Sequence, residues 1–143
     1  MDEEDILPNQ YKNIMTLFST SRYTLKNPRI TIEPRRGLPV VFSFWINNKG
    51  NEVVSIYSRS GDYRVEYGQI HNGNWYKKGN PDKRVINLVN TLNTNPGKVI
   101  REASNIEDKC CFCRKDLTDG QSTKVGFGKT CAENWGLKDI WLR

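Results

Sequence analysis

The four cysteines of this chain lie close together. The chain has 143 residues, and all four cysteines fall between positions 110 and 131. A disulfide framework would spread its cysteines through the chain, whereas such a cluster is typical of a metal site. Cys110 and Cys113 form a C-x2-C pair, which lets one tight turn present two sulfur atoms to a tetrahedral ion, and Cys131 would supply a third. This spacing predicts bound Zn²⁺.

The sequence leaves the fourth ligand of this site open. A second C-x2-C pair would need a cysteine at position 128 or 134, which are Gly128 and Asn134. Cys111 or a water molecule is favoured, although joint ligation by Cys111 and its neighbour Cys110 would strain the backbone. The other candidates are His71, Asp116, Asp119 and Glu133.

A short helix is predicted around Cys131. Thr130 and Glu133 have the spacing of a capping box, which would place Cys131 at the first helical position, and Gly136 suits the helix end. A knuckle, a hairpin and this helix together predict a treble-clef-like zinc module. Because three thiolate ligands are typical of structural sites, we expect the ion to hold the fold rather than to activate water.

The same segment resembles a small domain of uncharacterised proteins that recurs in bacteriophages, prophages and plasmids. The shared pattern is C-x-x-C…L-T-D…S…G-x-G-x-x-C-A, and it covers about residues 109–137. Arg114 and Lys129 depart from the pattern, where relatives often have glycine and proline, and they add positive charge beside the cysteines. The resemblance implies a phage origin and a zinc site at the three cysteines of the pattern, but no established activity.

The residues before the cysteines predict an antiparallel β-meander. Three segments have the apolar patterns of β-strands, namely residues 40–46, 52–59 and 63–67. Asn72-Gly73 favours a type I′ hairpin that leads into a further strand.

Two helices are expected to pack on this sheet. The first has Pro8 in its first turn and continues through Phe18, and the second begins with Asn80 as N-cap and ends at residues 95–97. The fold class is therefore α+β. We expect a sheet domain over residues 1–105, of which 1–7 are flexible, and a zinc module with its tail over residues 106–143.

The charge of the chain favours a polyanionic partner. The sequence has 22 lysines and arginines against 16 acidic residues, and the first five positions hold four of those acids. A body this basic favours nucleic acid. The residues expected to contact it are Arg35, Arg36, Arg114, Lys115, Lys124 and Lys129. Phe112, Phe127 and Trp135 could stack on bases, but so small a module needs them as core.

A different class of function is a phage effector that binds and inhibits a host protein, such as a defence factor, a nuclease or a transcription factor. An enzyme is not expected, because the chain has one histidine and neither a zinc-protease motif nor a phosphate-binding loop. The longest apolar run is too short to span a bilayer, and the acidic start is unlike a secretory signal. We therefore expect a cytoplasmic protein.

Overall fold

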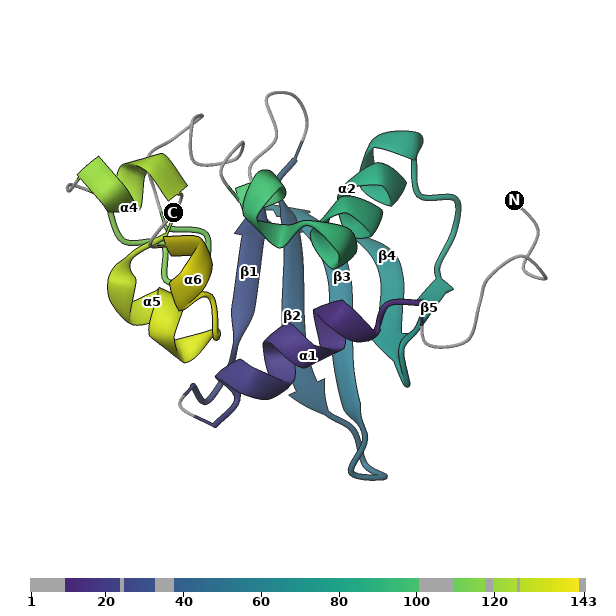
Figure 1. Cartoon of the computed structure of the whole chain (residues 1–143). Coiled ribbons are helices and arrows are strands. Elements are labelled where there is room, and N and C mark those ends of the chain that lie inside the picture. The colour runs from purple at the N-terminus through teal and green to yellow at the C-terminus, as the bar shows by residue number, and fades with distance from the viewer. Residues whose placement is uncertain are drawn as a thin grey trace.

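A five-stranded antiparallel sheet forms the centre of the fold. The computed structural model describes residues 10–23, 25–32, 38–100, 110–117, 120–125 and 127–141. The strands follow chain order in the sheet and are β1 (Arg29–Ile32), β2 (Val40–Ile46), β3 (Glu52–Ser60), β4 (Tyr63–His71) and β5 (Asn74–Lys77) (Figure 1). Each strand pairs antiparallel with the next, which confirms the meander predicted from β2 to β5, whereas β1 has no counterpart among the predicted strands.

Two helices cover one face of the sheet, and three short helices lie beside its β1 edge (Figure 1). The two are α1 (Lys12–Ser21) and α2 (Lys83–Thr94), and the three are α4 (Gly120–Val125), α5 (Lys129–Asn134) and α6 (Lys138–Trp141). Residues 96–100 are helical as well. The α+β class is thus confirmed. No helix in the described part of the chain is long and apolar enough to cross a membrane.

The core lies between the sheet and the layer of α1 and α2. On β2, the alternate residues Val40, Phe42 and Phe44 are buried, and α1 contributes Ile14 and Phe18 to the same core. Val85, Val89 and Leu92 form the buried apolar stripe of α2 in the same core. Burial of each such side chain contributes roughly 1.5–3 kcal/mol, so these stripes fix the helices to one face.

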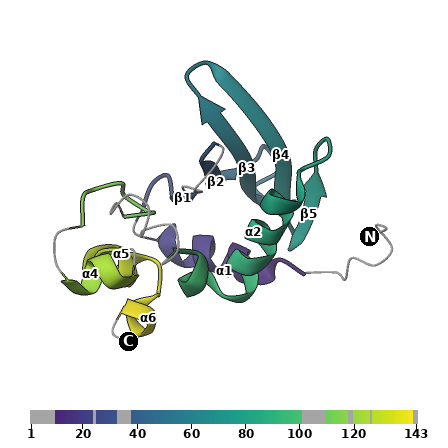
Figure 2. The same ribbon diagram turned by 90° about the horizontal axis from the view of Figure 1, so that it is seen from above.

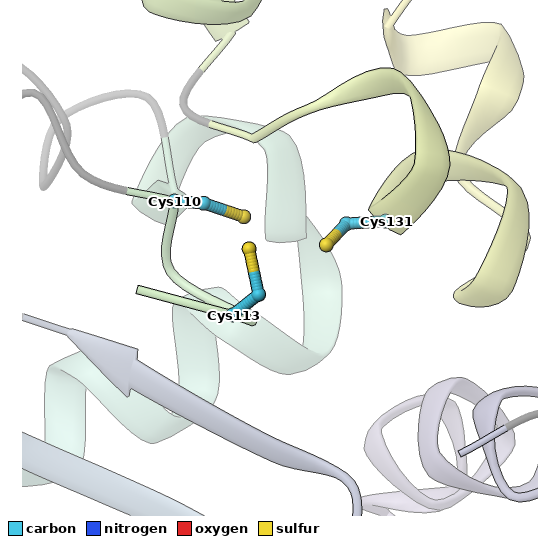
Figure 3. A group of neighbouring side chains, drawn as sticks. All are labelled: Cys110, Cys113 and Cys131. Atoms are coloured by element: carbon cyan, nitrogen blue, oxygen red, sulfur yellow. The ribbon is translucent and has the colours of Figure 1, made fainter. Parts of the chain in front are cut away.

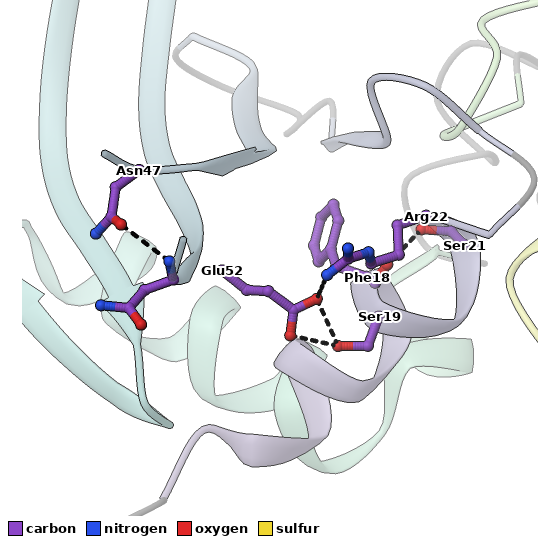
Figure 4. A network of polar contacts seen from close by, with 7 residues as sticks. Phe18, Ser19, Ser21, Arg22, Asn47 and Glu52 are labelled. Atoms are coloured by element: carbon purple, nitrogen blue, oxygen red, sulfur yellow. Dashed lines mark hydrogen bonds and ion pairs between the residues drawn. The ribbon is translucent and has the colours of Figure 1, made fainter. Parts of the chain in front are cut away.

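A carboxylate on the first residue of β3 ties α1 to the sheet. Ser19 Oγ donates a hydrogen bond to Glu52 Oε1 at 3.2 Å, and Arg22 Nη1 forms an ion pair with Glu52 Oε2 at 2.6 Å (Figure 4). The Arg22 guanidinium also lies 5.8 Å from the centre of the Phe44 ring. These contacts orient the C-terminal half of α1, where Phe18 packs against Trp135 at the end of the cysteine-bearing helix α5.

The N-terminal end of α2 differs from the sequence prediction, whereas its C-terminal end, with Asn95 as C-cap, agrees with it. The N-cap is Asp82 and not Asn80, because the Asp82 side chain accepts a hydrogen bond from the Val85 N–H at 3.0 Å. After Asn95 the chain becomes helical again at residues 96–100. Pro96 therefore starts a helical segment, a place where a missing N–H costs nothing, instead of closing one.

Two glycines shape the pairing of β4 with β5, one in the turn between the strands and one within β4. Asn72 and Gly73 both have positive φ, 53° and 75°, which confirms the predicted type I′ turn. Further back, a β-bulge shifts the β3–β4 register, and Gly68 has a φ of +113°. A Cβ atom at Gly68 would collide with the Tyr76 carbonyl oxygen and approach the Lys77 Cα to 2.9 Å. Close pairing of β4 with β5 therefore requires glycine at this position.

We predict that Gly68→Ala lowers the free energy of unfolding by more than about 2 kcal/mol, because the new methyl group both strains φ and pushes β5 away. Gly79→Ala is the matched control, since Gly79 also has positive φ (+66°) but open space around it, and about 1 kcal/mol is expected there. Urea unfolding followed by circular dichroism measures both losses. Equal losses would contradict the proposed role of the close strand approach.

Candidate metal centre

Three cysteine thiols converge beside the β1 edge of the sheet. The Sγ atoms of Cys110, Cys113 and Cys131 lie within 4.8 Å of one another. The three side chains point toward a common centre (Figure 3). In a tetrahedral site with metal–sulfur bonds of about 2.3 Å, the sulfur atoms are about 3.8 Å apart. The three thiols can therefore hold one metal ion with small side-chain movements.

A tight turn over residues 110–115, which we call the knuckle, positions the first two candidate ligands. The Arg114 N–H donates to the Cys110 carbonyl oxygen at 2.9 Å, and the Cys110 N–H donates to the Lys115 carbonyl oxygen at 3.0 Å. Arg114 adopts a left-handed φ of 64°, which reverses the chain direction after Cys113. The turn thus brings both sulfur atoms to the same side, as the C-x2-C spacing predicts.

The third ligand comes from α5, which begins earlier than predicted. The N-cap is Gly128, which has no side chain to cap the helix. The helix starts at Lys129, so Cys131 is its third residue. The predicted capping box is wrong because Thr130 already lies within the helix. Between the two cysteine groups, residues 120–125 form α4 where a hairpin was expected, and a treble-clef arrangement is not shown.

The end of α5 anchors the cysteines to the sheet domain. Gly136 has the predicted positive φ of 70°, and the Leu137 N–H donates to the Ala132 carbonyl oxygen at 2.8 Å, which closes the helix in a Schellman motif. The preceding residue, Trp135, packs edge-on against Phe18 of α1 with ring centres 4.9 Å apart. It also stacks on Phe112 at 4.4 Å.

The aromatic residues of the cysteine segment are therefore core residues. Trp135 and Phe127 are buried and Phe112 is partly buried, as the small size of the segment predicts. They belong to one hydrophobic core that continues into the sheet domain. The predicted boundary between residues 105 and 106 lies outside the described residues.

The three thiols share protons when no cation lies between them. The Cys131 thiol donates a hydrogen bond to the Cys110 sulfur, and this bond is the largest cause of a Cys110 pKa lowered to about 5. Burial opposes this change, and backbone N–H groups of Cys113, Gly128 and Phe112 contribute to it. The same hydrogen bond raises the pKa of Cys131 above its usual value. The fold thus stabilises one thiolate at neutral pH and prepares the cluster for a cation.

Cys111 does not join the cluster, which contradicts its prediction as a ligand. Its side chain is 3% exposed and packs in the hydrophobic core, where burial raises the pKa of the thiol. Its carbonyl oxygen accepts a hydrogen bond from the Thr31 N–H at 2.9 Å and so attaches the knuckle to β1. Cys110 is one of the three grouped sulfur ligands and Cys111 is not, so the two neighbouring cysteines serve different purposes.

The remaining candidates for a fourth ligand also lie outside the cluster. His71 is on β4, three strands away from β1, with its ring 5.1 Å from that of Tyr76. Asp116 and Glu133 are exposed and are not among the grouped side chains, and Asp119 lies outside the described residues. Within the described part of the chain, the protein thus supplies three ligands, and a fourth position is left for water or a bound molecule.

A basic groove opens beside the cysteines. Its volume is about 560 Å³, and all three clustered cysteines line it. Four cationic side chains also line it, against the single carboxylate of Asp116. These cations are Lys26, Arg29, Lys115 and Lys129. None of the four forms an ion pair with another described residue.

The sequence found only part of this basic surface. Lys115 and Lys129 were predicted, and the structure brings them together in the groove. Arg114 is half-buried in the knuckle, the Lys124 side chain is outside the description of α4, and Arg35 and Arg36 lie outside the described residues. Lys26 and Arg29 were missed, because no sequence signal indicates that the start of β1 lies against the knuckle.

Comparisons with family models, with curated proteins and with solved structures gave no match to this chain.

We predict that Cys113→Ser and Cys131→Ser each abolish stoichiometric metal binding, because each removes one of three ligands. Cys111→Ala is the matched control and should keep about one equivalent of metal per chain, since this thiol lies in the core. Metal analysis of the purified full chain measures all three variants. Loss of metal from Cys111→Ala in a folded protein would contradict the assigned ligand set.

In the metal-free protein, thiolate absorbance in the ultraviolet should show a step near pH 5, because the pKa of Cys110 is lowered to about 5. The step should disappear in Cys110→Ser and persist in Cys111→Ala. Since the unfolded thiol titrates near 9.0, the stability contributed by this thiolate is complete above that pH and is lost as the pH falls through about 5. A first step at the ordinary thiol value would contradict this hydrogen-bonded cluster.

Proposed function

We propose that this chain is a zinc-binding protein that binds nucleic acid in the basic groove beside its metal centre. The observation that supports this most is the position of four cations around the three clustered cysteines. Zn²⁺ with three thiolates carries a formal charge of −1. The four positive charges of the groove exceed the negative charges of the zinc–thiolate site and of Asp116 together. The zinc-loaded groove therefore still attracts an anion.

Zinc would act in this proposal as a structural crosslink. It would fix the knuckle, which carries Lys115, relative to α5, which carries Lys129. Thiolate ligation favours zinc over hard cations such as Mg²⁺ or Ca²⁺. The resemblance of residues 109–137 to a phage domain supports a phage origin as part of the same proposal.

In this proposal the groove binds phosphates, so the affinity for nucleic acid should depend on the salt concentration. Affinity for nucleic acid falls with a slope of about 0.7 to 0.9 in log–log form for each phosphate that the protein neutralises. Four cationic residues line the one groove. We expect several of them to contact phosphates at once.

The test is the double variant Lys115→Ala with Lys129→Ala in the zinc-loaded full chain. Binding to DNA should weaken, and the slope of log affinity against log salt between about 50 and 200 mM should fall by roughly 1.5. Fluorescence anisotropy with a labelled oligonucleotide measures both. The wild-type protein provides the reference slope.

The matched control is Lys12→Ala with Lys83→Ala, which removes the same charge from exposed positions on α1 and α2. This control should leave the slope nearly unchanged. Equal effects of the two double variants would mean that net charge alone carries the binding. Such a result would refute the groove as the nucleic-acid-binding site. Salt-independent capture of one host protein would favour the effector alternative.

A further inference from the structure

We propose that the sheet face turned away from α1 and α2 binds the bases of single-stranded nucleic acid. This inference rests on the proposed function and extends it to the kind of nucleic acid. We call this surface the open face, and its relevant residues are Trp45, Ser55, Tyr57, Arg64, His71 and Tyr76. No helix in the described part of the chain covers it (Figure 2).

The strand register places these side chains on one surface. Trp45 of β2 is opposite Val53 of β3, and Val53 is opposite His71 of β4. His71 is opposite Asn74, and Tyr76 follows two residues later on β5. Because side chains alternate between faces along a strand, these residues face away from the core positions that lie between them.

Two aromatic rings are presented on the open face. Trp45 is 41% exposed, and its Nε1 donates a hydrogen bond to Ser55 Oγ at 2.8 Å, which fixes the indole in place. Tyr76 is 54% exposed, and its ring lies 5.1 Å from the His71 ring. Strand spacing puts β2 and β5 about 14 Å apart, a distance that a few nucleotides can bridge.

These rings are not needed by the main core. Trp45 and Tyr76 do not belong to the hydrophobic core under α1 and α2. Val53, which is 1% exposed, is buried on the opposite side of the sheet from that core. Exposed aromatic rings held in fixed positions on a sheet are the usual stacking platform for unpaired bases, which have an apolar surface of matching shape.

The charge of the open face fits a phosphate backbone. Arg64 stacks on the Tyr57 ring with its guanidinium 3.8 Å from the ring centre, and it pairs with Glu66 at 2.9 Å. The register places Arg59 and Arg29 on the same face, so three arginines stand against one carboxylate. Single-stranded nucleic acid, with its negative backbone and exposed bases, matches these arginines and aromatic rings better than a duplex does, because the bases of a duplex are already stacked.

The open face and the basic groove are continuous. Arg29 is the first residue of β1, is exposed on the open face, and also lines the groove. A single strand bound in the groove could therefore continue across β1 toward Trp45. The groove would hold phosphates, and the open face would hold bases.

The experiment compares two ligands with the zinc-loaded full chain. One is an oligothymidylate of about 12 nucleotides, and the other is a duplex of the same length. Trp45→Ala and Tyr76→Ala should each weaken single-strand binding about tenfold, which corresponds to 1.4 kcal/mol, and change duplex binding less than twofold. Trp45→Phe keeps a ring and should restore most of the single-strand affinity.

Tyr63→Ala is the matched control, because Tyr63 is 64% exposed but its register places it on the other face of the sheet. It should change neither affinity. If Trp45→Ala and Tyr76→Ala leave single-strand binding unchanged while the groove variant weakens it, the open-face inference is wrong and the proposed function stands. An equal loss for duplex and single strand would also overturn the inference. Absence of binding to both ligands at low salt would overturn both proposals and indicate a protein partner instead.

Discussion

Three sulfur atoms within 4.8 Å of one another cannot all be thiolates unless a cation lies between them. Without metal, the repulsion between thiolates is avoided because Cys131 stays protonated and donates a hydrogen bond to Cys110. With metal, the same geometry becomes a coordination site that joins the knuckle to α5. Every other feature of this end of the molecule, including the groove, depends on how these two segments are held together.

The candidate metal centre is built into the main fold. Trp135 and Phe112 connect the cysteine segment to Phe18, and the Cys111 carbonyl oxygen binds the backbone of β1. As a result, the groove is formed partly by residues near β1 and partly by residues of the knuckle and α5. Loosening the cysteines would therefore disturb Lys115 and Lys129, whereas the contacts of α1 and α2 with the sheet do not pass through the cluster.

The sequence was informative where the structure follows from local spacing. The meander, the Asn72-Gly73 turn and the three clustered cysteines could all be predicted, because each depends on residues close together in the chain. The helix starts were less accurate, since nearby capping residues compete: Asp82 caps α2 in place of Asn80. Packing of the knuckle against β1 depends on contacts between distant segments, so Lys26 and Arg29 could not be assigned to the groove. For the same reason, the core position of Cys111 became clear only from the fold.

X-ray absorption spectroscopy of the zinc-loaded full chain counts the sulfur atoms bound to the ion and so identifies the ligand set. We expect three sulfur ligands at about 2.3 Å and one lighter oxygen or nitrogen ligand. Four sulfur ligands would place Cys111 on the metal and contradict its position in the core. Two or fewer would show that the three thiols do not hold a common ion.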